Sequence, residues 1–231
     1  MRIICCVRTR NEETNIARFI KSYSEIADKI LVADGGSTDR TLEIASKYNN
    51  VDVRSYTKVV WGDNGIWRNP EGKHLNFLYK WALQLGADWI LFDDCDSFPT
   101  KDLQRNGRRF IEAADKVGKV GLLAYHIYLY GKDCWFPEMN NPGKFLWGWK
   151  YNSGLSIRDT EDWGIIYDNV PKDDRCLPIE YPFSLLHDYT PNLDIVYKKL
   201  DFYNNCGKMT PTKHPIEMGG RLAVRESWMI D

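Results

Sequence analysis

Short apolar strands alternate with amphipathic helices over the first hundred residues, and this order most constrains the fold. Continuous or alternating apolar runs predict strands at residues 2–8, 29–33, 51–56 and 89–92. Between them, apolar residues three and four apart predict helices at 11–26, 37–48 and 73–85. Parallel strands joined by crossover helices build layered sheets, so the pattern predicts an α/β protein with a mixed, mostly parallel sheet flanked by helices.

The second half of the chain gives weaker signals. A helix at 101–117 and one long strand at 120–130 continue the alternation. Residues 133–181 lose the periodicity and are rich in Trp, Gly, Asn and Pro, with a candidate hairpin at 153–157 or 164–167. A further helix is predicted from Pro191, and 211–231 receives no assignment. A chain of 231 residues without an obvious linker fits a single domain over 1–231.

Composition and hydropathy disfavour several classes of protein. The formal net charge is −1 and the pI about 6.4, which disfavours a general polyanion binder. We expect no membrane span, because no stretch reaches the ~18 apolar residues of one, and no secretory leader, so the expected location is cytoplasmic. The six cysteines form no CxxC pair and are predicted to be buried as small hydrophobic residues.

Polar residues follow three of the predicted strands at the point where each strand ends. Arg8-Thr9 follows the first, Asp34-Gly35-Gly36 the second, and Asp93-Asp94-Cys95-Asp96 the fourth. Ligands of open parallel sheets bind beyond the carboxyl ends of the strands. We therefore expect these three segments to meet at one site.

The aspartates of the third segment suit a cation. Three carboxylates within four positions repel one another unless water or a cation relieves them. Oxygen ligands in an Asp-x-Asp arrangement suit Mg²⁺ or Mn²⁺, which can bridge a diphosphate. The alternative is an acidic cap ahead of the helix at 101–117, with Pro99 at the turn.

The segment from Asp34 to Thr41 has two readings as well. Its glycines permit a tight turn from strand to helix, and Ser37, Thr38 and Asp39 supply capping oxygens. Asp34, at the strand end, can accept a hydrogen bond from a base or a ribose. The alternative is a well-built strand-to-helix turn with no ligand.

Taken in order, these motifs resemble family 2 glycosyltransferases, which have the GT-A fold. The matching elements are Asn11-Glu12 after the first strand, the Asp34–Thr41 turn and Asp94-Cys95-Asp96. Residues 72–77, which lead a helix, are also similar to the family. The resemblance is firm over residues 1–100 and resumes more weakly around Pro182–Tyr203, where Leu185–Tyr189 ahead of a Lys-rich helix is similar to small bacterial and viral members.

The resemblance implies a role for each matching residue. Nucleotide binding falls to Arg8, Thr9, Asn11, Glu12, Asp34, Gly35, Ser37, Lys73 and Asp94, and metal binding to Asp94, Asp96 and His187. The chain would divide into a nucleotide-binding half, 1–100, and an acceptor-side half, 101–231. One departure is Gly35, which stands where the family usually has a second acidic residue; this change either weakens ribose recognition or shifts it to Asp39.

The implied activity is transfer of a sugar from a nucleotide-diphosphate donor, by default a UDP-sugar, to an acceptor hydroxyl with Mn²⁺ or Mg²⁺. The family usually inverts the anomeric centre, which requires a carboxylate base; Asp162 and Glu161 are the preferred candidates. The chain contains no Q-x-x-R-W motif, which argues against processive polymerisation. Acceptors consistent with the sequence are a glycan, a protein or a modified nucleobase, and no oligomeric state is specified.

Two other functions fit parts of the pattern. A nucleotidyltransferase acting on sugar phosphates also combines an α/β sheet with metal-bound aspartates, but it usually has a glycine-rich loop after the first strand, and Arg8–Asn11 contains no glycine. A catalytically inactive domain that binds nucleotide sugars would keep the fold without a working base.

Overall fold

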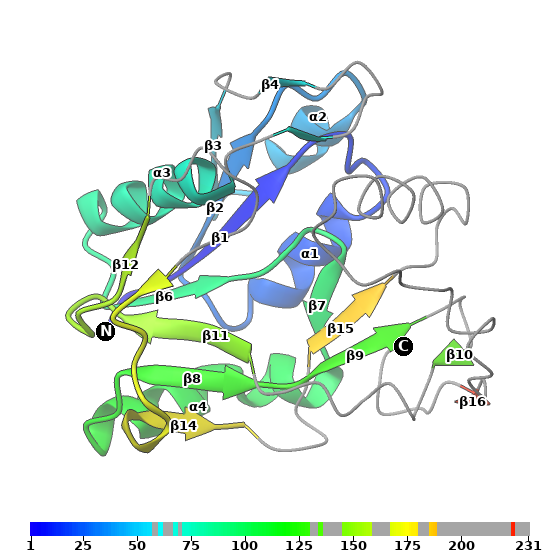
Figure 1. Ribbon diagram of the computed structural model, residues 1–231. Coiled ribbons are helices and arrows are strands. Elements are labelled where there is room, and N and C mark those ends of the chain that lie inside the picture. The colour runs from blue at the N-terminus through cyan, green and yellow to red at the C-terminus, as the bar shows by residue number, and fades with distance from the viewer. Residues whose placement is uncertain are drawn as a thin grey trace.

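A central sheet organises the molecule, with strand order β14-β8-β11-β6-β1-β2-β3 (Figure 1). The computed structural model describes residues 1–56, 60–61, 67–68, 71–129, 134–135, 145–158, 167–179, 185–188 and 223–224. The strands of this sheet are β1 Ile3–Thr9, β2 Lys29–Asp34, β3 Val51–Ser55, β6 Trp89–Phe92, β8 Gly121–Ala124, β11 Phe145–Lys150 and β14 Cys176–Pro178. The described helices are α1 Ile16–Tyr23, α2 Thr41–Ala45, α3 Glu71–Gln84 and α4 Lys101–Lys116, with a 3₁₀ turn at Asp173–Arg175.

Strand directions confirm the predicted mixed sheet. The neighbours β3, β2, β1 and β6 all run parallel, and β14 is parallel to β8. Only β11 runs antiparallel to both of its neighbours, β6 and β8, within the described part of the sheet. The carboxyl ends of β1, β2 and β6 therefore lie at the same edge (Figure 1).

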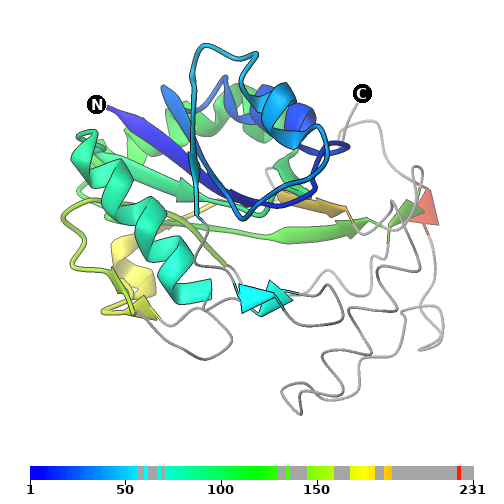
Figure 2. The same ribbon diagram turned by 90° about the horizontal axis from the view of Figure 1, so that it is seen from above.

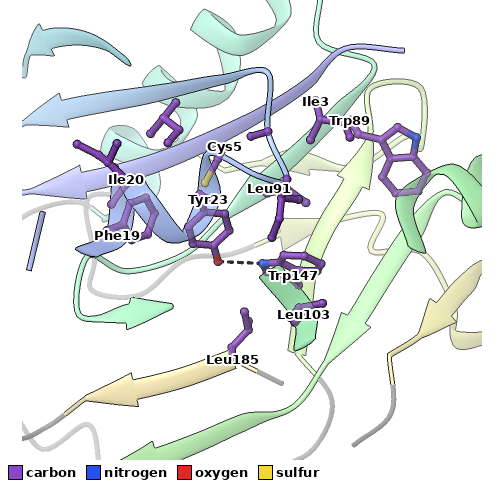
Figure 3. Packing of buried hydrophobic residues seen from close by; sticks show 14 of the residues in the cluster. Ile3, Cys5, Phe19, Ile20, Tyr23, Trp89, Leu91, Leu103, Trp147 and Leu185 are labelled. Atoms are coloured by element: carbon purple, nitrogen blue, oxygen red, sulfur yellow. Dashed lines mark hydrogen bonds between the residues drawn. The ribbon is translucent and has the colours of Figure 1, made fainter. Parts of the chain in front are cut away.

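Helices cover both faces of this sheet (Figure 2). On one face α1, α2 and α4 pack over a cluster that includes Phe19, Tyr23, Leu103 and Trp147 (Figure 3). On the other face α3 packs with its apolar side on residues of β1, β2 and β6. Burial of these faces supplies the main favourable free energy of folding.

A smaller sheet adjoins the first and has the order β16-β10-β9-β15-β7. Its strands are β7 Ser97–Pro99, β9 His126–Leu129, β10 Cys134–Trp135, β15 Leu185–Asp188 and β16 Ala223–Val224. Two further strand pairs are β4 Val60–Trp61 with β5 Trp67–Arg68, and β12 Ser156–Ile157 with β13 Tyr167–Asp168. Because β7 directly follows the acidic segment, this sheet ties that segment to β15.

Several sequence predictions need correction. The first helix spans Ile16–Tyr23 rather than 11–26, and the second spans Thr41–Ala45 rather than 37–48. Both begin late because the residues before them are held in hydrogen-bonded loops. The long strand predicted at 120–130 is divided into β8 and β9, which belong to different sheets. The helix predicted from Pro191 lies outside the described residues. Among the helices that are described, none has the length and apolar character needed to cross a bilayer.

The aromatic segment contains the largest omission. Strand β11 lies in the middle of the central sheet, yet its sequence, Phe-Leu-Trp-Gly-Trp-Lys, was assigned to an aperiodic region. Its Trp147 and Trp149 are almost wholly buried on opposite faces of the sheet. Gly148 faces Leu91 of β6 so closely that an added Cβ would lie 2.4 Å from that side chain. This glycine therefore permits the close approach of two strands.

Candidate functional site

Three loops meet at the carboxyl edge of β1, β2 and β6, as the sequence predicts. Thr9, at the end of β1, is paired in register with Asp34 at the end of β2. Arg8 Nη2 lies 3.1 Å from Asp94 Oδ1, in the segment that follows β6. These contacts join the β2 turn, the end of β1 and the acidic segment into one rim.

The loops after β1 and β2 are held together by reciprocal hydrogen bonds. The backbone amide of Asn11 donates to Ser37 Oγ, and the side-chain Oδ1 of Asn11 accepts from the backbone amide of Thr38. At the next residue, the backbone amide of Glu12 donates to Thr41 Oγ1 at 2.7 Å. The Glu13 amide donates to Asp39 Oδ2, and the Arg40 amide donates back to the Glu13 carboxylate. We call residues 11–13 and 37–41 the loop clamp.

Backbone conformation at the loop clamp explains two residue choices. Asn11 has φ of 52°, in the left-handed region that Asn tolerates better than most residues. Gly36 has φ of 91°, which suits glycine because it has no Cβ. The tight turn predicted from the glycines is therefore present, whereas Ser37 and Thr38 bond to the neighbouring loop and to Asp34 instead of capping α2.

Asp34 is almost wholly buried, with 2% of its surface exposed. Its Oδ2 accepts from the amides of Gly36 and Ser37 at 2.9 and 3.0 Å. Its Oδ1 accepts from Ser37 Oγ at 2.5 Å and from Thr9 Oγ1 at 3.4 Å. A carboxylate has about four lone-pair sites, so these donors engage it fully and build the turn.

The acidic segment divides into inward and outward residues. Asp93 Oδ2 accepts from the buried Tyr23 hydroxyl at 2.5 Å, and the Tyr23 oxygen accepts from Trp147 Nε1 at 3.1 Å (Figure 3). Burial, reinforced by the nearby Asp94 charge, raises the pKa of Asp93 to about 8. Asp93 Oδ1 accepts from the Asp94 amide at 3.0 Å, which fixes the start of the segment. The Asp94 side chain is 54% exposed.

The predicted metal ligands come from neighbouring elements. Asp94 and Asp96 lie on the segment between β6 and β7, and the backbone of His187 in β15 is paired with Ser97, the residue after Asp96. Carboxylate and imidazole ligands suit Mn²⁺, and carboxylates suit Mg²⁺, so the donor set fits the predicted cation. Within the described residues, no three His, Cys, Asp or Glu groups already converge as a metal site.

Helix α3 provides two residues near the rim. Lys73 lies in its first turn and is partly buried. His74 is fully buried, lies 3.2 Å from the Ala33 carbonyl through Nε2, and stacks on Tyr56 with ring centroids 4.4 Å apart. Burial, and secondarily the Arg8 charge, lowers the pKa of His74 to about 3, so the ring is neutral at physiological pH.

The remaining predicted residues have different outcomes. Gly35 donates its amide to the Thr9 carbonyl at 2.8 Å and so belongs to the rim. The proposed bases Glu161 and Asp162 lie outside the described residues, between β12 and β13. The sequence analysis did not identify Tyr23 and Trp147 as the residues that hold Asp93 inward. The one hint in the sequence is that each carries a polar atom within an otherwise apolar helix face or strand.

Comparison with known proteins identifies the family. The chain matches the model described as Glycosyl transferase family 2 over residues 4–128. An uncharacterized glycosyltransferase of Rickettsia conorii is 32% identical over 103 residues, which cover 45% of this chain and 32% of that protein. The matched region thus spans about a third of that curated relative's length.

One of the solved structures that resemble this chain, that of S. aureus TarS, shows the same fold. The crystal structure of S. aureus TarS 1-349 in complex with UDP has a TM-score of 0.53 and 16% identity, covering 87% of this chain and 63% of that one. Glucosyl-3-phosphoglycerate synthase from Mycobacterium tuberculosis, crystallised with Mn²⁺, UDP and glucosyl-3-phosphoglycerate, has a TM-score of 0.45 and 14% identity, covering 100% and 88%. The predicted GT-A fold is confirmed. With more than half of its residues matched by the family model, the chain belongs to glycosyl transferase family 2.

Proposed function

We propose that this protein is a divalent-metal-dependent glycosyltransferase that moves a sugar from a nucleotide-diphosphate donor to an acceptor hydroxyl, with inversion and without processive polymerisation. UDP-sugars are the first donors to test. We further propose one domain over 1–231, in which residues 1–100 bind the nucleotide and 101–231 form the acceptor side. The activity follows from the family, and the division follows from the order of the motifs.

One observation carries the proposal: the 3.1 Å contact between Arg8 and Asp94. It brings the end of β1, next to the Asp34 turn, against the acidic segment that follows β6. A nucleotide diphosphate has a base and ribose at one end and negatively charged phosphates at the other. A rim that combines a polar turn, a guanidinium and two aspartates matches both ends of such a ligand.

Residue roles follow from position on the rim. Thr9, Asn11, Glu12, Gly35 and Ser37 shape the nucleotide pocket, partly through the loop clamp. Asp34 orients the turn and presents its backbone to the base. Arg8 and Lys73 provide positive charge for the phosphates, because guanidinium and ammonium groups are the usual partners of phosphate oxygens.

Asp94, Asp96 and His187 would hold Mn²⁺ or Mg²⁺. A bound divalent cation neutralises the charge that develops on a diphosphate leaving group. The protein side of the reaction then consists of orienting the donor and accepting a proton from the acceptor hydroxyl. We assign that second task to Asp162 or Glu161, with a glycan, a protein or a modified nucleobase as the acceptor class.

The test is release of nucleoside diphosphate from a panel of nucleotide sugars, with Mn²⁺ or Mg²⁺ and with EDTA. We expect slow donor hydrolysis that requires the metal, and Asp96→Asn should lower it about 100-fold or more. Asp52→Asn is the matched control, since Asp52 pairs with Lys29 at 2.7 Å on the surface of β2 and β3 and should leave the rate unchanged.

Three results would overturn the proposal. Release of pyrophosphate instead of nucleoside diphosphate would identify a nucleotidyltransferase. Failure of every nucleoside diphosphate to raise the melting temperature with metal present would remove the nucleotide site itself. Binding of nucleotide sugar without any turnover, given a suitable acceptor, would indicate a binding domain without catalysis.

A further inference from the structure

Arg8 lies on the rim beside Asp94, where the proposed sites for the nucleotide diphosphate and the divalent cation adjoin. The Arg8 side chain is 15% exposed, whereas the side chain of its partner Asp94 is 54% exposed. The arginine is therefore held largely within the protein, and the aspartate reaches outward. An arginine in a protein keeps its charge at every accessible pH, so wherever Asp94 is ionised a competing ligand must displace one partner of this pair.

The surroundings of Arg8 place it toward the nucleotide side as well. The Arg8 backbone is paired in register with Ala33 of β2, and the Ala33 carbonyl lies 3.2 Å from Nε2 of His74 in the first turns of α3. Arg8 thus lies between the α3 and β2 side of the rim and the acidic segment. A diphosphate that spans the rim would meet this guanidinium before or together with the aspartates.

Competition for Asp94 has a simple electrostatic basis. One oxygen of Asp94 accepts from Arg8, so a cation that takes this oxygen must displace the guanidinium or tolerate a positive charge beside it. A diphosphate removes the conflict because its oxygens can pair with a guanidinium in a bidentate manner. The same diphosphate provides further oxygen ligands for the cation.

We propose that Arg8 couples metal binding to nucleotide binding. It pairs with Asp94 until a nucleoside diphosphate binds Arg8 in place of that carboxylate. This inference rests on the proposed function and adds a role for a residue of this chain. Without nucleotide, Arg8 disfavours the cation at Asp94. With nucleotide bound, Arg8 pairs with the phosphates and Asp94 binds the metal. Such a coupling is reciprocal, so the metal strengthens nucleotide binding by the same factor.

The experiment measures Mn²⁺ binding to metal-stripped protein from the electron paramagnetic resonance signal of free Mn²⁺, with and without UDP. The Mn²⁺–UDP equilibrium in solution is measured separately and subtracted. In the wild type we expect weak binding of Mn²⁺ alone and much tighter binding with UDP. In Arg8→Gln, Mn²⁺ alone should bind about five- to tenfold tighter, and the strengthening by UDP should shrink by a similar factor or more.

Control variants separate this effect from a loss of fold. Arg108→Gln also removes an arginine from an aspartate, since Arg108 pairs with Asp28 at 2.8 Å, and it should change neither affinity. Arg8→Lys keeps the positive charge but not the forked geometry of the guanidinium. It should therefore bind Mn²⁺ alone as weakly as the wild type does, and UDP should strengthen its Mn²⁺ binding less than in the wild type. Thermal unfolding of each variant without ligand confirms that it is folded.

The outcomes distinguish the two levels of the proposal. If the wild type binds UDP and Mn²⁺ together but Arg8→Gln binds Mn²⁺ alone no more tightly, the coupling role of Arg8 is wrong and the glycosyltransferase assignment stands. If the wild type binds neither ligand, both are wrong. An Arg8→Gln variant that does not fold is replaced by Arg8→Lys, whose undiminished coupling would contradict the role.

Discussion

The loop clamp and the acidic segment lie on the same rim, but the structure uses their polar groups in opposite ways. In the loop clamp, backbone amides and side-chain oxygens of Asn11, Glu13, Ser37 and Asp39 bond to one another. In the acidic segment, Asp93 turns inward to Tyr23 while Asp94 stays 54% exposed. The loop clamp uses its polar groups to hold its own conformation, whereas the acidic segment presents a carboxylate to solvent.

This difference separates two meanings of a sequence motif. Asp34 belongs to the motif that suggests base recognition, yet its oxygens are engaged by the turn that it starts. Under the proposed function, motif residues of the first kind would act on a ligand through the backbone that they hold in place. Residues of the second kind would contact the ligand directly, and their substitution should affect binding or turnover far more than folding.

The largest expected effect on stability is that of Asp34→Ala. The variant removes a buried carboxylate that accepts from the amides of Gly36 and Ser37, so the free energy of unfolding should fall by about 4 kcal/mol. Asp94→Ala removes a carboxylate that is itself 54% exposed, so the loss should be smaller, about 1–2 kcal/mol. Urea unfolding of both variants measures the contrast, and equal losses would show that the two regions do not differ.

A second prediction uses pH to separate the two regions. His74, beneath the β2 turn, has its pKa lowered from 6.5 to about 3, so its contribution to stability is lost as the pH falls below 6.5. Asp93 has its pKa raised from 3.8 to about 8, so the folded state binds the extra proton and stability falls as the pH rises from 3.8 toward 8. Between pH 5 and 6.5 these two contributions oppose each other.

Single substitutions should reveal each contribution. In Asp93→Asn, stability should rise from pH 5 to 6.5 relative to the wild type, by about 2 kcal/mol. In His74→Gln, it should fall over the same interval by a similar amount, since about 1.4 kcal/mol accompanies each pH unit. Denaturant unfolding in EDTA measures the slopes. Parallel pH profiles for all three proteins would contradict the assignment of either group.

Much of this architecture is legible in the sequence, for reasons visible in individual residues. Strand β6 was predicted with its observed bounds, because its apolar run is closed by Asp88 and Asp93. The meeting of Arg8, Asp34 and the acidic segment follows from parallel strands alone. Strand β11 was missed because Trp and Gly alternate there for packing reasons that only its neighbours reveal, such as the close approach of Gly148 to Leu91.

The site was less predictable than the fold. Hydrogen bonds between residues 11–13 and 37–41 join segments more than twenty residues apart, and periodicity carries no information about such pairs. The same contacts make α1 and α2 begin later than the predicted helices. The inward turn of Asp93 also depends on tertiary structure, because Tyr23 and Trp147 come from α1 and β11. The sequence shows three aspartates within four positions but does not indicate which one is buried.

The smallest expected effect concerns Asn11 and asks whether the loop clamp acts through its backbone. Asn11→Gly loses the bond from the Thr38 amide but suits the φ of 52°, whereas Asn11→Ala loses the same bond and also strains the backbone. The alanine variant should therefore be about 1 kcal/mol less stable than the glycine variant. If Asn11 serves the nucleotide only through the clamp, affinity for UDP should be reduced more by alanine than by glycine. If its amide side chain contacts the nucleotide directly, both variants should lose the same affinity, because both lack that group. Isothermal titration of the two variants with UDP and Mn²⁺ decides between these roles, and the second result would move Asn11 from the region that shapes the rim to the region that binds.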